Sequence, residues 1–385
     1  MKGKIRNMYP GGNTPDGFHS YYSYILPQRK AKKIFCLKGG PGVGKSTLMK
    51  RIGEHFADCG EDVDFLWCSS DPDSLDGVLI RDRNVAVVDG TAPHIVDPKN
   101  PGAVDEIVNL GEHWDQEALY RHRDEIIGCG EEISRYFEYA YEYLKCAQQQ
   151  YMFMEKLFDS LVSHDDMKIY ESIVHKEIDR TGSVSGAEER VEKSRGAGKK
   201  TTRGVKKKAF ATAITPGGIK NHLPSIISDI REIIVVDVPL GFRADSIIVS
   251  VSERFTDAGF DVEEYYCPMF PEEKAEHAVC RDAGVAVITC SEYHDIEDMG
   301  LCRAAANVSI CSDVRRGMRA NPAVADMLEE LTEESGENIT RAVKMLKQAK
   351  SRHDTLEEYY APNMDFSGIE EEQNKIIAKI ERLVL

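Results

Sequence analysis

The chain of 385 residues contains two related copies of one segment, and the copies lie about 200 residues apart. Thr14–Gly17 recurs at Thr215–Gly218. Two longer runs recur in the same order: Glu54–Val63 at Glu253–Val262, and Arg81–Val87 at Arg281–Val287. An ordered series of matches is typical of an internal duplication. We therefore expect two units of the same architecture, arranged in tandem along the chain.

A glycine-rich stretch in the first copy matches the spacing G-x-x-x-x-G-K-[ST]. Glycine lets a backbone wrap around a phosphate in conformations that a Cβ atom forbids. In this pattern the lysine reaches the β- and γ-phosphates, and the hydroxyl group takes one Mg²⁺ position. The residues expected to bind the phosphates are Gly39, Gly40, Pro41, Gly42, Val43, Gly44, Lys45, Ser46 and Thr47.

The segments on either side of this loop predict an α/β unit. Ile34–Leu37 is a short apolar run, which is typical of a buried parallel strand. Thr47–Phe56 carries Leu48, Met49, Ile52 and Phe56 at helical spacing. A strand, a glycine-rich turn and a helix in this order form the context in which such a loop holds an anion at the helix N-terminus.

The second copy has lost the residues that this chemistry requires. Its loop, Val238–Ser246, has Arg243 in place of Gly44, Ala244 in place of Lys45, and Asp245 in place of Ser46. A carboxylate at a helix N-terminus is itself stabilising, so Asp245 is a candidate for the vacant anion position. We expect one functional nucleotide site in the first half and a degenerate site in the second.

Acidic residues follow the apolar strands of the first copy. Asn84–Val88 is an apolar run that ends at Asp89, where a carboxylate would hold Mg²⁺ together with Ser46. Asp71 follows the strand expected at Val63–Cys68, and it is a candidate general base or second Mg²⁺ contact. A turn or a helix cap explains Asp71 equally well.

The loop after Asp89 offers further polar side chains near the carboxyl ends of strands, where open α/β sheets bind ligands. Thr91, His94, Asp97 and Asp105 are candidates to bind an acceptor or to position water. Stabilisation of the loop is the alternative for each of them, and we favour it for His94 because His294 persists in the degenerate copy. Cys267, His277 and Cys280 lie close in sequence, but their spacing matches no zinc pattern, so we expect buried thiols.

Composition limits the classes of partner. The formal net charge of −16 argues against non-specific coating of nucleic acid. The chain has no apolar run that would span a membrane and no apolar leader, so we expect a cytoplasmic protein with no membrane partner. The ten cysteines include no C-x-x-C pair, which fits reduced thiols.

The expected domain organisation follows the duplication. The first half is 1–192, with a core at about 14–110 and a helical arm at about 113–180. The second half is 209–385, with a core at about 209–312 and an arm at about 323–385. A basic stretch at 193–208 joins them, either as a flexible linker or as a lid that contacts an anion such as nucleotide, substrate or RNA.

Both arms show apolar residues at helical spacing, interrupted by glycine or proline. We expect helical hairpins that pack between the two halves. A homodimer surface and a lid over the nucleotide are the alternatives.

These motifs allow a resemblance to be stated. Gly39–Thr47 resembles the phosphate loop of the P-loop NTPase superfamily. The whole chain resembles a prokaryotic family of tandem P-loop ATPase-like proteins, through Asp71–Asp76, Asp89–His94, Pro101–Glu106 and Asn363–Phe366. The resemblance implies two three-layer α/β/α units, each with a helical appendage, and it implies ATP binding with ATPase activity. The family can carry an intact loop in both halves, and this chain departs from it at Arg243, Ala244 and Asp245.

Three functions are compatible with these residues. The first is an Mg²⁺-dependent ATPase in which Lys45, Asp89 and Asp71 are the catalytic candidates. The second is a kinase for a small molecule or nucleotide, with the loop from Asp89 to Asp105 holding an acceptor. The third is an ATP sensor that does not hydrolyse its ligand. The chain has no N-K-x-D motif, which favours ATP over GTP, and no L-S-G-G-Q signature, which disfavours a transporter-type ATPase.

Overall fold

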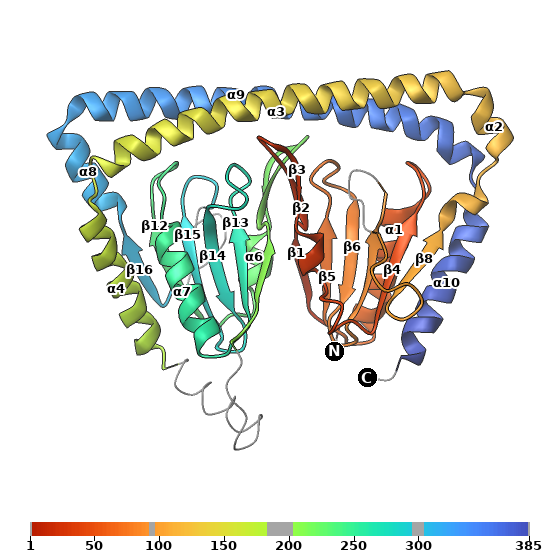
Figure 1. Ribbon diagram of the computed structural model, residues 1–385, viewed down its shortest axis with the longest axis horizontal. Helices are drawn as coiled ribbons and strands as arrows, with labels where there is room; N and C mark the ends of the chain where they lie inside the picture. The colour runs from red at the N-terminus through yellow and green to blue at the C-terminus, as the bar shows by residue number, and fades with distance from the viewer. Residues whose placement is uncertain (1, 92–96, 183–202, 295–303, 384–385) are drawn as a thin grey trace, which may run out of the picture. The chain divides into compact units, whose positions relative to one another are not determined.

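The computed structural model describes residues 2–91, 97–182, 203–294 and 304–383. The chain divides into two compact units (Figure 1). Unit 1 comprises Met1–Glu142, Ala213–Lys220 and Arg341–Leu385, and unit 2 comprises Tyr143–Thr212 and Asn221–Thr340. Each unit is therefore assembled from both halves of the sequence, and the expected boundaries at 1–192 and 209–385 do not coincide with the units.

Unit 1 is built on a six-stranded mixed sheet with the strand order β1-β5-β6-β7-β4-β8. Only β6 runs against its neighbours, and the other adjacent strands are parallel. The strands are β1 (Ile5–Met8), β5 (Val63–Trp67), β6 (Leu75–Ile80), β7 (Val85–Asp89), β4 (Lys33–Lys38) and β8 (Asp105–Asn109). The strands expected around Ile34–Leu37, Val63–Cys68 and Asn84–Val88 are confirmed.

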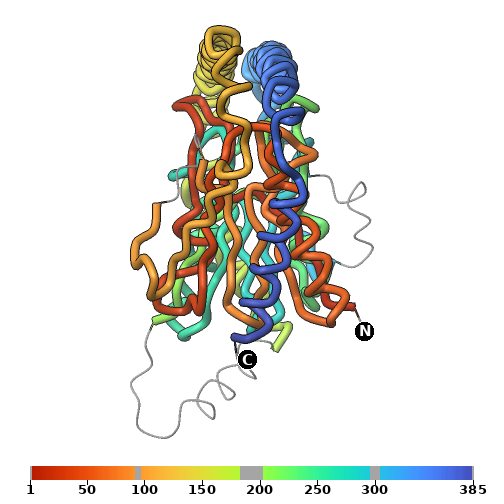
Figure 2. Tube along the Cα trace, turned by 90° about the vertical axis from the view of Figure 1, so that its right-hand side faces the viewer, coloured from red at the N-terminus to blue at the C-terminus, as the bar shows by residue number. Residues whose placement is uncertain are grey.

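Two helices cover one face of this sheet. Helix α1 (Lys45–Asp58) buries Leu48, Met49, Ile52 and Phe56, the helically spaced residues found in the sequence. Helix α10 (Phe366–Arg382) lies beside α1 and buries Ile376 and Ile380 in the same core (Figure 2). The apolar stripe of each helix packs on the sheet because burial of these side chains is the main favourable term in folding.

The opposite face of the unit 1 sheet corrects the expected three-layer arrangement. A small apolar cluster covers it, in which Leu26 packs with Ile34, Cys36 and Val88. Leu26 follows η1 (Tyr22–Tyr24), a single 3₁₀ turn. Among the described residues of unit 1, this face carries no α-helix comparable to α1, because the segment before β4 is too short and too rich in turns. A two-stranded hairpin of β2 (Gly11–Thr14) and β3 (Gly17–Ser20) precedes η1 in the chain.

Unit 2 repeats the sheet of unit 1. Its strand order, β9-β13-β14-β15-β12-β16, corresponds position by position to that of unit 1, with β14 antiparallel to its neighbours. The strands are β9 (Lys206–Ala209), β13 (Val262–Tyr266), β14 (Ala275–Cys280), β15 (Val285–Cys290), β12 (Glu232–Asp237) and β16 (Ala306–Ser309). Two similar mixed six-stranded sheets in tandem confirm the duplication.

Helices α7 (Asp245–Asp257) and α4 (His164–Arg180) pack together in unit 2, in the arrangement of α1 and α10 in unit 1. The short helix α6 (Leu223–Ile227) takes the place of η1. A hairpin of β10 (Thr212–Thr215) and β11 (Gly218–Asn221) corresponds to β2 and β3, and most of its residues belong to unit 1. Helix α8 (Cys311–Ala320) follows β16.

The basic linker expected at 193–208 is shorter than the sequence suggested. Residues 193–202 lie outside the described residues, but Lys206–Ala209 forms the edge strand β9. Lys206 pairs with Glu264, and Lys208 pairs with Glu272. Lysines are suited to an edge strand, because their charges discourage pairing with another chain.

The helical arms contain single long helices rather than hairpins of short ones. After α2 (Gln116–Arg121), helix α3 (Arg123–Asp159) runs for 37 residues, and α9 (Pro322–Tyr360) runs for 39. Gly128, Gly130 and Gly336 do not interrupt them, because a glycine inside a helix costs only about 1 kcal/mol relative to alanine. The short 3₁₀ helices η2 (Leu110–His113) and η3 (Ala361–Asn363) lie at the ends of the arms.

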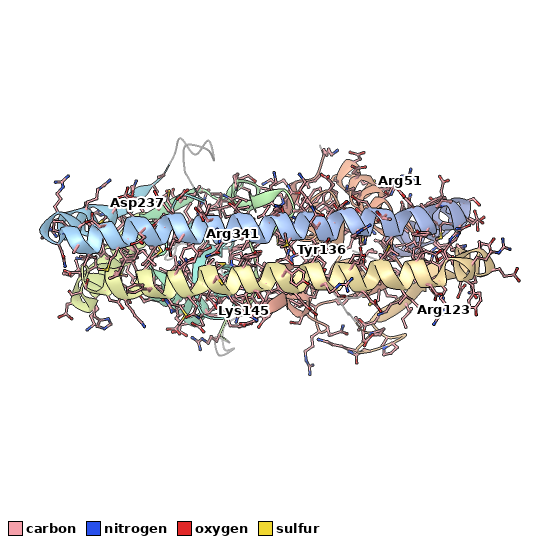
Figure 3. The ribbon with its side chains drawn as sticks, turned by 90° about the horizontal axis from the view of Figure 1, so that it is seen from above. Arg51, Arg123, Tyr136, Lys145, Asp237 and Arg341 are labelled. Atoms are coloured by element: carbon pink, nitrogen blue, oxygen red, sulfur yellow. The ribbon has the colours of Figure 1, made fainter. Side chains whose placement is uncertain are left out.

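Segments of α3 and α9 lie side by side within each unit (Figure 3). In unit 1, Arg352 of α9 pairs with Glu132 of α3. In unit 2, Gln150 of α3 contacts Glu334 and Asn338 of α9. Among the described residues, no helix combines the length and apolar character needed to cross a membrane.

Candidate functional site

The glycine-rich loop connects β4 to α1, as the sequence predicted. Gly42 and Gly44 have φ angles of 67° and 82°, in the left-handed region that favours glycine. Gly44 is also the N-cap of α1, so the loop ends where the helix begins at Lys45. A Cβ atom on Gly39 would lie 3.0 Å from a methyl group of Val43, so a side chain at the first position would have to push Val43 aside.

The Lys45 ammonium group is turned back over this loop. Its Nζ atom donates to the carbonyl oxygen of Gly39 at 2.6 Å and to that of Gly40 at 3.2 Å. It also lies 3.0 Å from Thr91 Oγ1 and 3.2 Å from Asp89 Oδ2. The lysine side chain is only 13% exposed, so these oxygen atoms, rather than water, supply most of the contacts to its charge.

Asp89 lies beside the loop because of the strand order. It is the last residue of β7, which pairs in parallel with β4 so that Asp89 stands opposite Leu37. The backbone N–H of Thr91 donates to Asp89 Oδ1 at 2.8 Å, and Thr91 Oγ1 donates to the Gly39 carbonyl at 2.7 Å. These bonds tie the end of β7 to the start of the loop.

Ser46 lies one residue into α1 and joins it to β6. Its Oγ atom accepts a hydrogen bond from the backbone N–H of Leu75 at 3.0 Å. A hydroxyl oxygen that accepts one bond retains a second lone pair, so this contact is compatible with a metal ligand. Thr47 follows on the same turn of the helix and lines the same cavity.

A cavity of about 640 Å³ opens above the loop. Gly40–Thr47 forms its floor, with Asp71 and Asp89 on the wall. Ile133 and Phe137 of α3 contribute an apolar side. The remaining wall comes from the C-terminal arm in unit 1: Ala349, Lys350, His353, Leu356 and Glu357 of α9, and Phe366 of α10.

Asp71 serves the turn and the cavity at once. Its Oδ2 atom accepts from Ser74 Oγ at 2.8 Å, as expected for a turn. The same oxygen lies 3.5 Å from the Nζ atom of Lys350 on α9. Burial lowers the pKa of Lys350, but a hydrogen bond with Asp354 and the charges of Asp71 and Asp354 outweigh burial, so the pKa lies above its usual value. A charged lysine therefore faces Asp71.

Asp97 and Asp105, two other candidates in the loop after Asp89, do not line this cavity. Asp97 lies on a separate cavity of about 290 Å³ with Asp105, and it pairs with Lys38. Asp105 is buried and accepts hydrogen bonds from Gln28 Nε2 and from the backbone N–H groups of Lys99 and Asn100. Its contacts match the alternative of loop stabilisation. His94 lies outside the described residues.

Several residues of the cavity wall were not predicted, because no sequence pattern connects them to the glycine-rich loop. Lys350, His353 and Glu357 share a face of α9 and lie more than 300 residues beyond the loop in the chain. Two backbone hydrogen bonds, from Asp115 to Asn363 and from Asp365 to His113, fasten the start of α10 beside η2. The segment Asn363–Phe366, conspicuous in the sequence, thus includes the residues that make this connection.

The second loop, in unit 2, is filled by protein side chains. Arg243 forms a bidentate ion pair with Asp245 at 3.0 and 3.2 Å, and Glu155 and Glu273 lie 3.8 Å from the same guanidinium group. Asp245 is thus paired with Arg243. Beside Gly241, an added Cβ would lie 2.8 Å from Met154 and 3.2 Å from Tyr151, both on α3.

Comparisons with family models, with curated proteins and with solved structures returned no match. The assignment of a function to this chain therefore depends on the residues around the unit 1 cavity.

Proposed function

We propose that unit 1 binds a nucleoside triphosphate with Mg²⁺ and hydrolyses it, with ATP as the preferred nucleotide. The observation that carries the proposal is the ion pair between Lys45 and Asp89 at 3.2 Å, formed at the carboxyl ends of two adjacent parallel strands. A phosphate-binding lysine and an acid that ends the neighbouring strand are the two charged groups that this chemistry requires. The proposal places both units among the P-loop NTPases, with unit 2 as a degenerate member.

The residues present suit a triphosphate. Positive φ angles at Gly42 and Gly44 allow backbone N–H groups to face an anion. The Lys45 ammonium group rests on the Gly39 and Gly40 carbonyls, from which it can move to a phosphate oxygen, a stronger acceptor because it is charged. Phe137 and Phe366 give the same cavity aromatic surface that suits a planar base.

The metal would be held by hard oxygen ligands. Ser46 and Asp89 supply a hydroxyl group and a carboxylate, which together with phosphate oxygens are the ligands that Mg²⁺ prefers. When bound, Mg²⁺ neutralises the charge that develops on the phosphate oxygens during phosphoryl transfer. Asp71 is the acid on the cavity wall that we assign to orient or deprotonate the attacking group.

Phosphate release from Mg-ATP and Mg-GTP tests this proposal. The native chain is expected to release phosphate from ATP faster than from GTP, and Lys45→Ala is expected to abolish release, because the variant lacks the charge that contacts the β- and γ-phosphates. Lys168→Ala is the matched control, since Lys168 is an exposed lysine of α4 in unit 2. Circular dichroism establishes that the three proteins are folded.

The alternatives separate in the same experiment. Transfer of phosphate to an added metabolite, without release in its absence, would replace the ATPase with a kinase. Saturable ATP binding with neither release nor transfer would indicate a sensor. If the native chain shows no ATP binding at millimolar nucleotide, the proposal fails altogether.

A further inference from the structure

Unit 2 contains a compact group of two histidines and one carboxylate that lies outside its degenerate loop. One ligand atom from each of Glu276, His277 and His294 lies within 4.8 Å of the other two. The histidines are 1% and 3% exposed, and the Glu276 side chain is 12% exposed. Their rings meet edge to face, with centroids 4.7 Å apart.

An irregularity in the sheet explains how neighbours in sequence meet at one point. Successive side chains of a regular strand point to opposite faces. In β14, however, the pairing with β13 shifts between Tyr265 and Tyr266, so that His277 stands opposite Tyr265 and Ala275 opposite Tyr266. Glu276 is the extra residue. Bulges of this kind redirect side chains and occur frequently beside functional sites.

The histidine ring nitrogens lack the partners expected of buried polar groups. Among the described residues, both ring nitrogens of His277 and Nδ1 of His294 have no hydrogen-bond partner. His294 Nε2 lies 2.6 Å from Thr212 Oγ1. A buried polar atom without a partner costs about 1–3 kcal/mol, and three such atoms in one cluster call for an explanation.

The surroundings of the two rings suit metal ligands. Both histidines are buried, which disfavours the charged imidazolium form. A neutral imidazole is the form that binds a metal. The contact between His294 Nε2 and Thr212 would orient the His294 ring, because a hydrogen bond to the second ring nitrogen commonly orients a metal-bound histidine.

We propose that Glu276, His277 and His294 bind one divalent transition-metal ion, of which Zn²⁺ is the representative. Two imidazoles and a carboxylate are the ligands of many zinc and non-haem iron sites, and they are too rich in nitrogen for Mg²⁺ or Ca²⁺. Ligand atoms around a tetrahedral zinc ion lie about 3.4 Å apart, so the observed group would close by a small movement. The ion would satisfy the unpartnered nitrogens.

Among the described residues, unit 1 lacks the counterpart of one member of this group. The bulge also occurs in β6 of unit 1, where Asp76 is the extra residue. The residue after it is Gly77, which supplies no ligand at the position of His277, and a Cβ there would lie 3.0 Å from Leu66. Unit 1 retains an acid at the bulge without the adjacent imidazole, whereas unit 2 has both.

A metal titration of the full-length chain tests the site. The protein is stripped with a chelator, freed of chelator, and titrated with Co²⁺, whose visible absorption reports its geometry, and Zn²⁺ is then used to displace it. We expect one Co²⁺ ion per chain with tetrahedral-type absorption and full displacement by Zn²⁺. His277→Gln and His294→Gln are each expected to weaken Co²⁺ binding at least about 10-fold.

His175→Gln is the matched control. His175 is half-buried on α4 in unit 2 and hydrogen-bonds to Ser250, apart from the cluster. The His175→Gln variant should bind Co²⁺ as the native chain does. The proposal is overturned if the stripped native chain binds no Co²⁺ at micromolar concentration, a result that does not depend on the folding of any variant. It is also overturned if both histidine variants bind Co²⁺ as the native chain does. A strong near-ultraviolet thiolate band would also overturn it, because it would assign the ion to cysteines.

Discussion

At the residue scale, the Lys45 side chain connects the functional candidates of unit 1. It contacts two loop carbonyls, the Thr91 hydroxyl and the Asp89 carboxylate, so three segments of the chain meet at one ammonium group. These contacts position the lysine over the loop. Under the proposed function, a charge held in place in this way would require little rearrangement to contact a phosphate oxygen.

Asp71 gives the sharpest prediction at this scale. Asp71→Asn should lower kcat for ATP hydrolysis by about 10²-fold, the size typical of a positioned acid or base, and leave ATP affinity within about threefold. The hydrogen bond from Ser74 can be kept by the amide oxygen, so the turn should persist. Steady-state kinetics and nucleotide titration measure the two effects.

Lys350→Met serves as the comparison for Asp71→Asn, because it removes the cation that faces Asp71 from α9. If Asp71 acts on the attacking group, the Asp71 variant should be more impaired in kcat than in KM. An Asp71→Asn protein with native kcat would exclude Asp71 from catalysis and leave it a turn residue.

The residues of the site differ in how far the sequence predicts them. Gly39–Thr47 is a local pattern, and its conformation follows from glycine content, so nine consecutive residues identify it. Asp89 was predictable as the end of an apolar strand, although its place beside Lys45 depends on the pairing of β4 with β7. Lys350 and Phe366 were not predictable, because helical spacing does not say which surface a helix covers.

At the scale of elements, α10 is the feature that completes the unit 1 core. Ile376 and Ile380 are buried with Phe56 of α1 and Val63 of β5. The Arg83 guanidinium group donates to the carbonyls of Ile380 and Leu383 at the helix C-terminus, where the Ile380 carbonyl also accepts from the backbone N–H of Leu383. Arg83 also pairs with Glu61, which helps to hold its pKa above the usual value.

Ile380→Ala is expected to destabilise the protein by about 2–5 kcal/mol, the range for a large aliphatic side chain removed from a packed core. Ile377→Ala on the same helix is the matched substitution, since Ile377 only partly enters the core and should cost less. Urea unfolding followed by circular dichroism measures both. Equal losses for the two variants would show that α10 is not docked through Ile380.

The elements were predicted better than their assembly. The three strands and the one helix that the sequence placed in the first core lie within two residues of their expected bounds, because apolar periodicity and turn residues mark where they begin and end. The expectation of helical hairpins was wrong for α3 and α9 because isolated glycines do not end a helix that has apolar contacts on both sides of them. The three-layer expectation was wrong for unit 1 because a short segment of turns closes the second face.

At the scale of the whole molecule, the two loops predict an unequal pair of sites. Isothermal titration calorimetry should find one ATP-binding site per chain. Rebuilding the loop as Arg243→Gly/Ala244→Lys/Asp245→Ser should leave that number at one, because Met154 and Tyr151 of α3 lie against Gly241. A second bound nucleotide in the rebuilt chain would show that the three loop residues alone had silenced unit 2.

No local sequence pattern shows which helix belongs to which unit. Helix α4 lies in the arm expected for the first half, yet it belongs to unit 2, whereas α10 from the end of the chain belongs to unit 1. The amphipathic pattern of each helix is the same whichever sheet it covers. The duplication was visible in the sequence, but the exchange of helices between the copies was not.

This exchange has a consequence for the history of the gene. A duplicated segment that loses its chemistry is ordinarily free to be deleted. Here the second copy carries α10, whose isoleucines are part of the unit 1 core, so deleting it would expose that core. Selection can erase the phosphate loop of the second copy residue by residue and still retain the copy itself. Under the proposed function, the second half persists because it supplies a helix to the core of the first.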